Sequence, residues 1–374
     1  MGGSVFGKNI KVMTFGESHG AAVGAVVDGI PSGLSLCRDD IQEMLDRRRP
    51  GKNDFSTKRN ETDEVEILSG VFEGKTLGTP IAMMVKNNDA HSSDYDALKD
   101  IYRPGHADFT FDAKYAFRDH RGGGRSSGRE TIGRVMAGAV CKKVLKEAGI
   151  KVSAYTRAIG PITAIETDLS EALSDPLFMP DHVVSERAAE YILKVKERGD
   201  SVGGVVECRI EGLFPGIGET VFDKLDAVLS KAVMSIGAVK GFEIGEGFNA
   251  ALLSGSENND PFFVGEDKRI EKRSNHSGGT LGGMSDGAPI IFRAAFKPTP
   301  SISLPQETVN KNGEDTVIEI KGRHDPVIVP RAVVVVESMA AIAILDLLIG
   351  DMSSRIDYIS SFSEKRKNEL QTDS

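Results

Sequence analysis

Hydrophobic and polar positions along the chain follow two periods. Seven segments have the alternating or continuous apolar pattern that predicts strands. Three others repeat apolar residues every three or four positions, which predicts amphipathic helices over 38–48, 130–147 and 222–236. The combination indicates a layered α+β protein. The predicted strands are 10–15, 22–27, 65–68, 80–85, 152–155, 202–210 and 289–296.

The most apolar stretch of the chain covers residues 332–348. It is interrupted by Glu337 and Asp346 and is short for a bilayer span of about 20 residues. We therefore expect a buried helix there. The polar segment 361–374 is predicted to be a disordered tail that follows a catalytic domain over residues 1–360.

One weak internal repeat is visible. Its first copy consists of Gly16–Gly20, an apolar strand and the turn 28–34. Its second copy consists of Gly199–Gly203, a second strand and the turn 211–217, and is similar in sequence. Each copy leads into an amphipathic helix. The similarity could be a coincidence among glycine-rich turns, but a duplicated strand-turn-helix unit would produce a core with pseudo-twofold symmetry. No linker separates the copies, so we predict one structural domain with two related halves.

Composition limits the partners and the compartment. The chain has 374 residues and a formal net charge of −9, which offers no general attraction to nucleic acid or to anionic membranes. Its 3 cysteines have no CxxC spacing, and an odd number suits free thiols in a reducing compartment. The first residues lack the pattern of a secretory signal. A cytoplasmic protein is therefore expected.

The segment 103–130 combines arginines, histidines and glycines densely. Gly122–Gly124 precede the predicted helix, for which Ser127 and Glu130 have the spacing of a capping box. Glycines before a helix let backbone amides approach an anion, and the helix dipole adds positive charge there. The segment is therefore predicted to hold phosphate. The alternative is that its arginines are solvated and its glycines only form a turn.

Three consecutive arginines, Arg47 to Arg49, end the first predicted helix. Cations at a helix C-terminus are stabilised by the dipole by about 0.3–1 kcal/mol, so capping is one interpretation. Three adjacent arginines exceed what capping needs, and a guanidinium binds phosphate or carboxylate in bidentate fashion. The run therefore favours a small substrate with two anionic groups.

Five of the 7 histidines lie in Gly-, Ser- or Arg-rich motifs rather than in apolar segments. For any one of them a structural hydrogen bond is a more ordinary role than catalysis, but as a group they indicate proton transfer near neutral pH. Their spacing matches no metal-binding motif, so no metal is expected. They are His19, His106, His120, His276 and His324.

A third glycine-rich element covers residues 274–287. It lacks the strand-turn-helix context of a dinucleotide-binding motif, so a conventional nicotinamide site is not expected. Its glycine pairs allow the backbone to approach a flat or phosphorylated ligand. The segments 297–301 and 321–326 follow, and the latter places cations, His324 and Asp325 side by side. Such a grouping can bind an anion and move a proton.

Together these motifs resemble the signature motifs of the chorismate synthase family, in order and without a large gap. The resemblance implies an enzyme, a carbon–oxygen lyase that eliminates phosphate from 5-enolpyruvylshikimate 3-phosphate in an anti-1,4 sense. The product is chorismate, at the last step of the shikimate pathway to the aromatic amino acids. Reduced FMN (FMNH2) would be required but not consumed. The matching motifs are 15–20, 46–51, 103–108, 122–129, 274–283, 297–301 and 322–326.

The resemblance also implies roles for individual residues. His19 would keep the reduced flavin protonated or neutral, and His106 would donate a proton to the leaving phosphate. Asp325 would assist deprotonation, together with the flavin ring nitrogen that takes up the C6 hydrogen. The division of roles between the two histidines rests on the resemblance alone. Contacts to the substrate phosphate and carboxylates are expected from Ser18, Arg48, Arg103, Arg129 and Arg323.

Several motifs are implied to bind FMN. Gly237 stands where relatives often have Asn or Pro, so a side-chain contact is absent there. The loop 52–55 has Asp54 where some relatives carry a further arginine, which leaves that anion contact open. The residues expected at FMN are Arg125, Ser126, Ser127, Gly237, Ala238, Gly282, Lys297, Pro298, Thr299, Pro300, Ser301 and Arg323.

The fold implied by the resemblance is a β-α-β sandwich around an internal duplication, assembled as a homotetramer. The absence of long insertions favours the monofunctional bacterial type, which receives reduced flavin from an external source rather than making it with NADPH. Two alternatives remain open from the residues. One is an FMN-dependent oxidoreductase acting on a phosphorylated metabolite, and the other is a non-catalytic phosphometabolite-binding protein.

Overall fold

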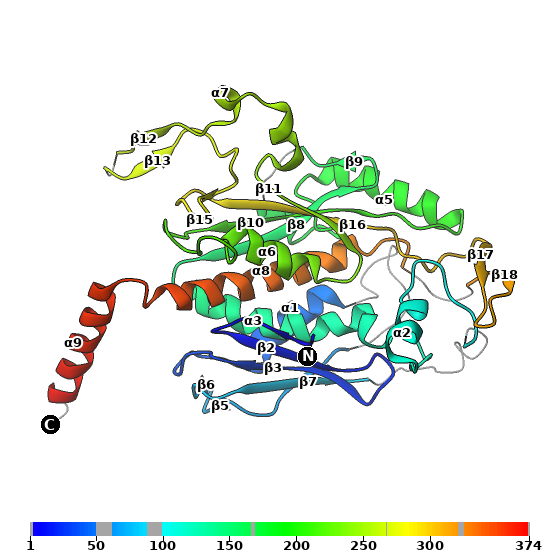
Figure 1. Ribbon diagram of the computed structural model, residues 1–374, viewed down its shortest axis with the longest axis horizontal. Coiled ribbons are helices and arrows are strands. Elements are labelled where there is room, and N and C mark those ends of the chain that lie inside the picture. Colours follow the sequence, from blue (N-terminus) through cyan, green and yellow to red (C-terminus); the bar gives the residue numbers. More distant parts are fainter. Residues whose placement is uncertain are drawn as a thin grey trace.

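The structure is a computed structural model, and it describes residues 3–49, 62–87, 99–165, 169–266, 268–320 and 325–372. In these residues the chain forms three layers, with helices enclosed between two antiparallel sheets (Figure 1). This arrangement confirms the predicted α+β class and the β-α-β sandwich. All seven predicted strands and all three predicted helices are present, with ends shifted by at most a few residues.

The first sheet forms the lower layer of Figure 1. Apolar side chains on one face of its strands point toward the helices: in β7, Ile81, Met83 and Val85 are buried, whereas the residues between them are partly exposed. This alternation follows from the two-residue period of a strand. The strand order is β1 (Val5–Phe6), β2 (Lys11–Gly16), β3 (Ala22–Asp28), β7 (Ile81–Lys86) and β4 (Val65–Ile67).

The second sheet lies on the opposite side of the helices. Its central strands are buried more completely, because the helical layer covers one face and further elements cover part of the other (Figure 1). The strand order is β11 (Val239–Ile244), β16 (Ile290–Phe296), β10 (Gly204–Glu211), β8 (Lys151–Ile159) and β9 (Ile162–Thr163).

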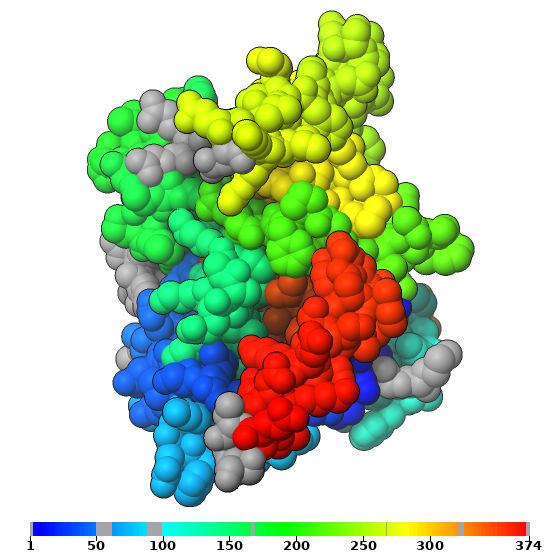
Figure 2. Space-filling model, turned by 90° about the vertical axis from the view of Figure 1, so that its left-hand side faces the viewer, coloured from blue at the N-terminus to red at the C-terminus, as the bar shows by residue number. Residues whose placement is uncertain are grey.

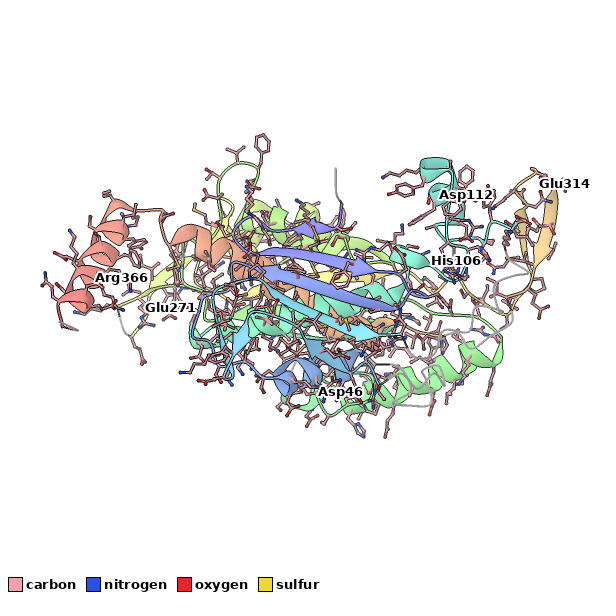
Figure 3. The ribbon with its side chains drawn as sticks, turned by 90° about the horizontal axis from the view of Figure 1, so that it is seen from below. Asp46, His106, Asp112, Glu271, Glu314 and Arg366 are labelled. Carbon is pink, nitrogen blue, oxygen red and sulfur yellow. The ribbon has the colours of Figure 1, made fainter. Side chains whose placement is uncertain are left out.

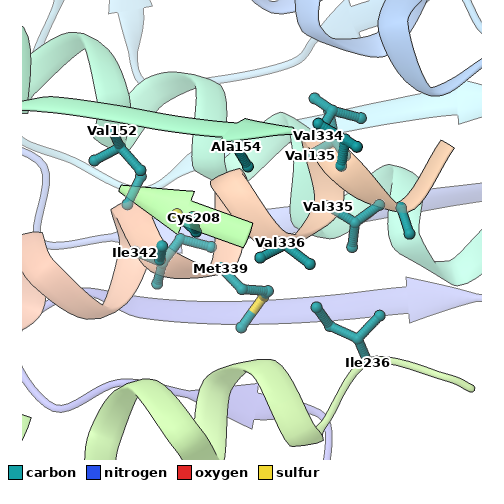
Figure 4. Packing of buried hydrophobic residues seen from close by; sticks show 14 of the residues in the cluster. Val135, Val152, Ala154, Cys208, Ile236, Val334, Val335, Val336, Met339 and Ile342 are labelled. Atoms are coloured by element: carbon teal, nitrogen blue, oxygen red, sulfur yellow. The ribbon is translucent and has the colours of Figure 1, made fainter. Parts of the chain in front are cut away.

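Four helices make the middle layer: α1 (Arg38–Arg48), α3 (Thr131–Glu147), α6 (Leu225–Met234) and α8 (Val329–Asp351). By length and composition α8 could cross a membrane, but 83% of its most apolar window is buried inside the protein, so it is a core helix. Its side chains pack against both α3 and the second sheet (Figure 4). The predicted buried helix is therefore confirmed.

The internal repeat is visible in the strand order. In the first half, β3 leads through a turn into α1, which is followed by β4, β7 and α3; in the second half, β10 leads into α6, which is followed by β11, β16 and α8. The sheet orders β2-β3-β7-β4 and β8-β10-β16-β11 are then the same. The two long helices α3 and α8 approach closely where Gly138 faces Ser338, since a Cβ on Gly138 would lie 2.2 Å from the Ser338 Cβ.

Smaller elements surround the layers. On one side lie α2 (Asp108–Tyr115) and the hairpin β17–β18 (Gln306–Val309 and Asp315–Ile318) (Figure 1). The 3₁₀ turns Gly124–Ser126 and Gly128–Glu130 precede α3, and the 3₁₀ turn Gly247–Leu252 follows β11. The others are the short hairpins β5–β6 (Val71–Phe72, Lys75–Thr76), β12–β13 (Phe262–Val264, Ile270–Lys272) and β14–β15 (Thr280–Leu281, Met284–Ser285), with α4 (Leu169–Ala172), α5 (His182–Glu197), α7 (Gly255–Asn258) and α9 (Ile356–Thr372).

The C-terminal segment differs from the expected disordered tail. Residues 361–372 belong to α9, an exposed helix that stands away from the layers (Figure 1). Figure 2 views this end of the molecule and shows the helix in red, with the yellow-green β12–β13 arm above it. The polar composition of α9 suits a solvated helix as well as a coil. Arg366 and Glu369 form an i,i+3 ion pair on the surface of this helix.

Candidate active site

A cavity of about 710 Å³ opens beside the first sheet, within the size range of ligand pockets. Its walls come from β1, β2, α2, the glycine-rich turn before α3, the C-terminal end of α6 and the middle of α8. Aromatic side chains of α2 and its C-terminal loop line one part. Four of the expected site residues line the cavity: Arg103, His106, Arg125 and Ser126.

His19 lies next to Gly122, one of the residues that line this cavity. It follows β2 in a tight turn, in which the Gly20 amide donates to the Glu17 carbonyl at 3.0 Å. Its ring packs on Gly122, where an added Cβ would lie 2.5 Å from the His19 Cε1. Gly122 has φ of +81°, so only glycine suits both its backbone and this contact. The Ser18 hydroxyl lies 3.2 Å from His19 Nδ1.

Asn87 fixes the turn that carries His19. Its side-chain amide donates to the carbonyls of Glu17 at 3.0 Å and of Gly20 at 2.8 Å. Its Oδ1 accepts a hydrogen bond from Arg129 Nε. Asn87 therefore links the histidine turn to one of the expected substrate-binding arginines, and no sequence motif pointed to it.

Glu17 is a further acidic group of the cavity. Burial raises the pKa of its carboxyl, an effect that the charge of Arg125 opposes and that of Asp119 reinforces. One carboxylate oxygen packs on Gly124, 2.9 Å from where a Cβ would stand. A half-buried carboxyl with a raised pKa suits a group that exchanges protons with a ligand.

His106 joins two of the motifs. Its Nε2 lies 2.9 Å from the Ser301 hydroxyl, and Lys297 Nζ donates to the Gly105 carbonyl at 2.8 Å. Burial lowers the pKa of Lys297, with a smaller contribution from the nearby charge of Lys240. The segments 103–108 and 297–301 are thus in direct contact, and Figure 3 shows His106 beside α2, far from α9.

The backbone of Lys297 adds another expected FMN segment to this group. Its amide donates to the Ala238 carbonyl at 3.0 Å. Ala238 has φ of +72°, an unusual conformation for a residue with a Cβ. The loop 237–238 therefore lies against the start of the segment 297–301.

Arg103 is buried and lines the cavity together with His106. It makes two hydrogen bonds to Asp108, at 2.7 and 2.8 Å, and one to the Gly122 carbonyl at 3.2 Å. Burial by itself would raise the pKa of Asp108, but hydrogen bonds and charge from Arg103, together with the charge of Arg118, hold it below its ordinary value. The ion pair fixes the guanidinium beside the backbone of the glycine-rich turn.

Arg48 and Arg129 share one buried carboxylate, Asp63. Arg48 donates to Asp63 Oδ2 at 2.8 Å and Arg129 donates to Oδ1 at 3.0 Å. Burial, together with the nearby charge of Arg331, lowers the pKa of Arg48 to about 10, although Asp63 opposes both effects. In this structure the Arg48 guanidinium ties α1 to the start of α3 through Thr131 and Gly128, away from the lining of the cavity.

Asp325 lies shortly before the start of α8 in the chain. Its backbone carbonyl accepts a hydrogen bond from the Thr299 hydroxyl at 2.9 Å, and its carboxylate forms an ion pair with Arg331. The Ser201 hydroxyl in turn donates to the Thr299 carbonyl at 2.7 Å. Arg323, His324 and the loop 52–55 lie outside the described residues.

Arg125 lies against β2 and faces the cavity. Its guanidinium donates to the Gly16 carbonyl at 3.2 Å and to the Thr14 hydroxyl at 2.6 Å. Ser126 lies in the same 3₁₀ turn, and Ser127 accepts a hydrogen bond from the Arg129 amide as the cap of the next 3₁₀ turn. The Glu130 carboxylate bonds to Thr14 and Arg134, so it is not the reciprocal partner in a capping box with Ser127.

The glycine-rich element 274–287 is organised by acidic side chains. The amides of His276 and Ser277 donate to Asp260, and the buried Lys272 bonds to Asp260 and Asp286. These hydrogen bonds hold the pKa of Asp260 far below its ordinary value, although burial opposes them. The amides of this turn are therefore already occupied by a carboxylate of the same chain.

Gly282 lies in the turn of the β14–β15 hairpin. The carbonyl of the next residue, Gly283, accepts a hydrogen bond from the Leu225 amide at the start of α6. The cavity instead takes in Lys231 and Ser235 at the other end of that helix, and a helix of this length spans about 15 Å. Within one chain, Gly282 is therefore not brought to the cavity with the other expected FMN residues.

Comparison with known proteins identifies the family of this chain. The family model described as chorismate synthase matches residues 10–349. The chain belongs to the chorismate synthase family. It is 59% identical over 367 residues to the chorismate synthase of Agathobacter rectalis, which covers 98% of this chain and 100% of the relative. The chorismate synthase of Methanosarcina barkeri is 54% identical over 354 residues, or 93% of this chain and 97% of the relative.

A solved structure gives the same result. A crystal structure of a chorismate synthase, 33% identical in sequence, superposes with a TM-score of 0.76 and covers 98% of this chain and 100% of its own. The expected family, the lyase class and the place in aromatic amino acid biosynthesis are thereby confirmed. The alternative of an FMN-dependent oxidoreductase receives no support.

Proposed function

We propose that this chorismate synthase family member eliminates phosphate from 5-enolpyruvylshikimate 3-phosphate with reduced FMN in the cavity beside the first sheet. The observation that carries the proposal is that Arg103, His106 and Arg125 line that cavity, while His19 packs on Gly122 in its lining. These residues come from three motifs, 15–20, 103–108 and 122–129, and their side chains supply the cations and titratable imidazoles that the loss of phosphate needs.

The residues present fit a phosphorylated flavin. Phe111, Tyr115 and Phe117 line part of the cavity and offer apolar surface to a ring system, while Arg103 and Arg125 offer positive charge. Arg125, Ser126, Ser127, the loop 237–238 and the segment 297–301 would hold FMN. The chemistry supplied by bound reduced FMN would be a transient electron for the loss of the allylic phosphate, returned within the same turnover.

The chain's own groups would perform the proton transfers. His106, next to Ser301, would protonate the leaving phosphate, and His19, packed on Gly122, would keep the reduced flavin neutral. Asp325 would assist removal of the C6 proton. Ser18, Arg48, Arg103 and Arg129, with Arg323, would bind the anionic groups of the substrate, since guanidinium groups bind phosphate and carboxylate.

The experiment mixes the protein anaerobically with dithionite-reduced FMN and 5-enolpyruvylshikimate 3-phosphate and follows inorganic phosphate and the chorismate diene. Equal amounts of both products, many per flavin and none with oxidised FMN, are expected. Consumption of one reductant per product would instead indicate an oxidoreductase. Phosphate without the diene would indicate a phosphatase, and neither product would point to a phosphometabolite-binding protein.

Single substitutions test the roles of the histidines. His106→Ala should slow phosphate release and leave the spectrum of bound reduced flavin unchanged, whereas His19→Ala should alter that spectrum. His182→Ala, at an exposed position of α5, is the matched control and should change neither. A spectral change in His106→Ala alone would reverse the assignment.

The remaining properties concern assembly and supply of the reductant. Residues 1–360 would form one catalytic domain of a cytoplasmic homotetramer of the monofunctional type. Exposed apolar side chains on the β12–β13 arm and α9, such as Phe262, Ile270 and Phe362, support association of subunits. Light scattering should give four times the mass of the chain. NADPH should not bleach FMN on the enzyme under anaerobic conditions at a rate comparable to turnover.

A further inference from the structure

Arg331 occupies an unfavourable position in α8. It lies in the first turn of the helix, directly after Pro330. Cations at a helix N-terminus interact unfavourably with the dipole, by about 0.3–1 kcal/mol. Its side chain is also largely removed from solvent, with 24% exposed. Helix stability therefore does not explain an arginine here.

The contacts of Arg331 connect two elements of the site. One terminal nitrogen forms a close ion pair with a carboxylate oxygen of Asp325, six residues earlier. The Nε donates to the carbonyl of Arg48 at 3.1 Å, one of the last carbonyls of α1. Helix-terminal carbonyls have no partner within the helix, so this bond also completes the end of α1.

The backbone of Asp325 is held separately, by the hydroxyl of Thr299. Within the described ranges, the charged groups around this region include Arg331 on α8, Arg48 and Arg49 at the end of α1, and Asp63. The Arg48 guanidinium is directed to Asp63, Thr131 and Gly128. Arg331, by contrast, bonds directly to the Asp325 carboxylate.

We propose that Arg331 is a positioning residue for the elimination: its guanidinium holds the carboxylate of Asp325 in the place and orientation from which it assists removal of the substrate proton. The inference rests on the proposed role of Asp325. Charge-assisted hydrogen bonds from a guanidinium are short and directional, and they fix the carboxylate more firmly than solvent would.

The expected effect follows from the geometry of proton transfer. Without the guanidinium, the Asp325 carboxylate loses a charge-assisted contact that orients it, and a misplacement of about 1 Å costs about 100-fold in rate. Arg331 does not line the cavity, so its substitution should change the binding of substrate and FMN little. The loss should therefore appear in kcat rather than in KM.

The test compares Arg331→Gln, Arg331→Lys and Asp325→Asn in the full-length protein, with chorismate formation as the assay. Arg331→Gln should lower kcat by about 100-fold with KM within about threefold, and it should increase the deuterium isotope effect at C6. Arg331→Lys restores a charge without the planar fork and should recover about tenfold. Arg355→Gln, which breaks an exposed arginine–aspartate pair, is the control and should behave as the wild type.

Three results would overturn the proposal: a wild-type kcat in Arg331→Gln, a loss confined to KM, or a wild-type kcat in Arg331→Lys. The lysine variant decides the matter if circular dichroism shows that Arg331→Gln does not fold. Asp325→Asn tests the role of Asp325 separately from that of Arg331. If it keeps wild-type activity, the proposed role of Asp325 fails; if it is inactive while Arg331→Gln is not, only the role of Arg331 fails.

Discussion

The contact between Gly122 and His19 allows a quantitative prediction. An alanine at position 122 would place its Cβ 2.5 Å from the His19 Cε1 and 2.6 Å from Nδ1. Ordinary carbon–carbon contacts lie at about 3.5–4.0 Å, so the ring must move by about 1 Å. Gly122 also has φ of +81°, and an L residue in the left-handed region costs about 1–2 kcal/mol.

Gly313 provides a matched control for the backbone effect. It has φ of +80° in the β17–β18 hairpin, and an added Cβ there would meet nothing within 4 Å. Gly122→Ala and Gly313→Ala should therefore both lose about 1–2 kcal/mol of unfolding free energy. Only Gly122→Ala displaces the imidazole of His19.

The assay is anaerobic chorismate formation with reduced FMN, beside urea unfolding of each variant. Gly122→Ala should lose about 100-fold in kcat, the cost of a displacement of about 1 Å at a reacting group, whereas Gly313→Ala should keep wild-type kcat. Equal kcat values in the two folded variants would refute the reasoning, because the position of His19 would then not matter for turnover.

Three further outcomes follow from buried polar groups. Asp63→Asn should destabilise the protein by about 3–5 kcal/mol in urea unfolding, because two buried guanidinium groups lose their shared carboxylate; a loss below 1 kcal/mol would contradict this. Because burial raises the pKa of Glu17, the ionised carboxyl destabilises the folded state as pH rises through that pKa, so Glu17→Gln should be stabilised relative to wild type at pH 7 and not below about pH 4. A constant difference across that range would contradict it. Ser301→Ala, which removes the hydroxyl 2.9 Å from His106, should shift the pH profile of kcat without lowering stability by more than about 1 kcal/mol; an unchanged profile would rule out that contact in turnover.

Much of the fold could be predicted from the sequence because its signals are local. The two-residue period fixed the faces of β2, β3 and β7, and the apolar run at 332–348 indicated a buried helix. The helix α5 was missed although its signal is present: Val184, Ala188 and Ile192 repeat every fourth residue after the cap Asp181. The four-residue period of these apolar positions is the one that α5 adopts, so no tertiary effect overrides the local signal.

The site was only partly predictable, for a physical reason. Glycine, arginine and histidine motifs are visible as composition, but their partners are single residues distant in the chain. Asp63 joins Arg48 to Arg129, and Asn87 holds the His19 turn, yet neither lies in a motif. Such pairings depend on how the layers bring distant segments together, so they become visible only in three dimensions.

The position of α8 has a consequence for synthesis on the ribosome. This helix packs on α3 and α1 from one half and on α6, β8 and β10 from the other, yet it is translated after all of them. Until it emerges, the apolar faces of both halves lack the element that joins them. We therefore expect folding to be completed only after nearly the whole chain has been made, so that nascent chains stalled before residue 329 remain sensitive to protease.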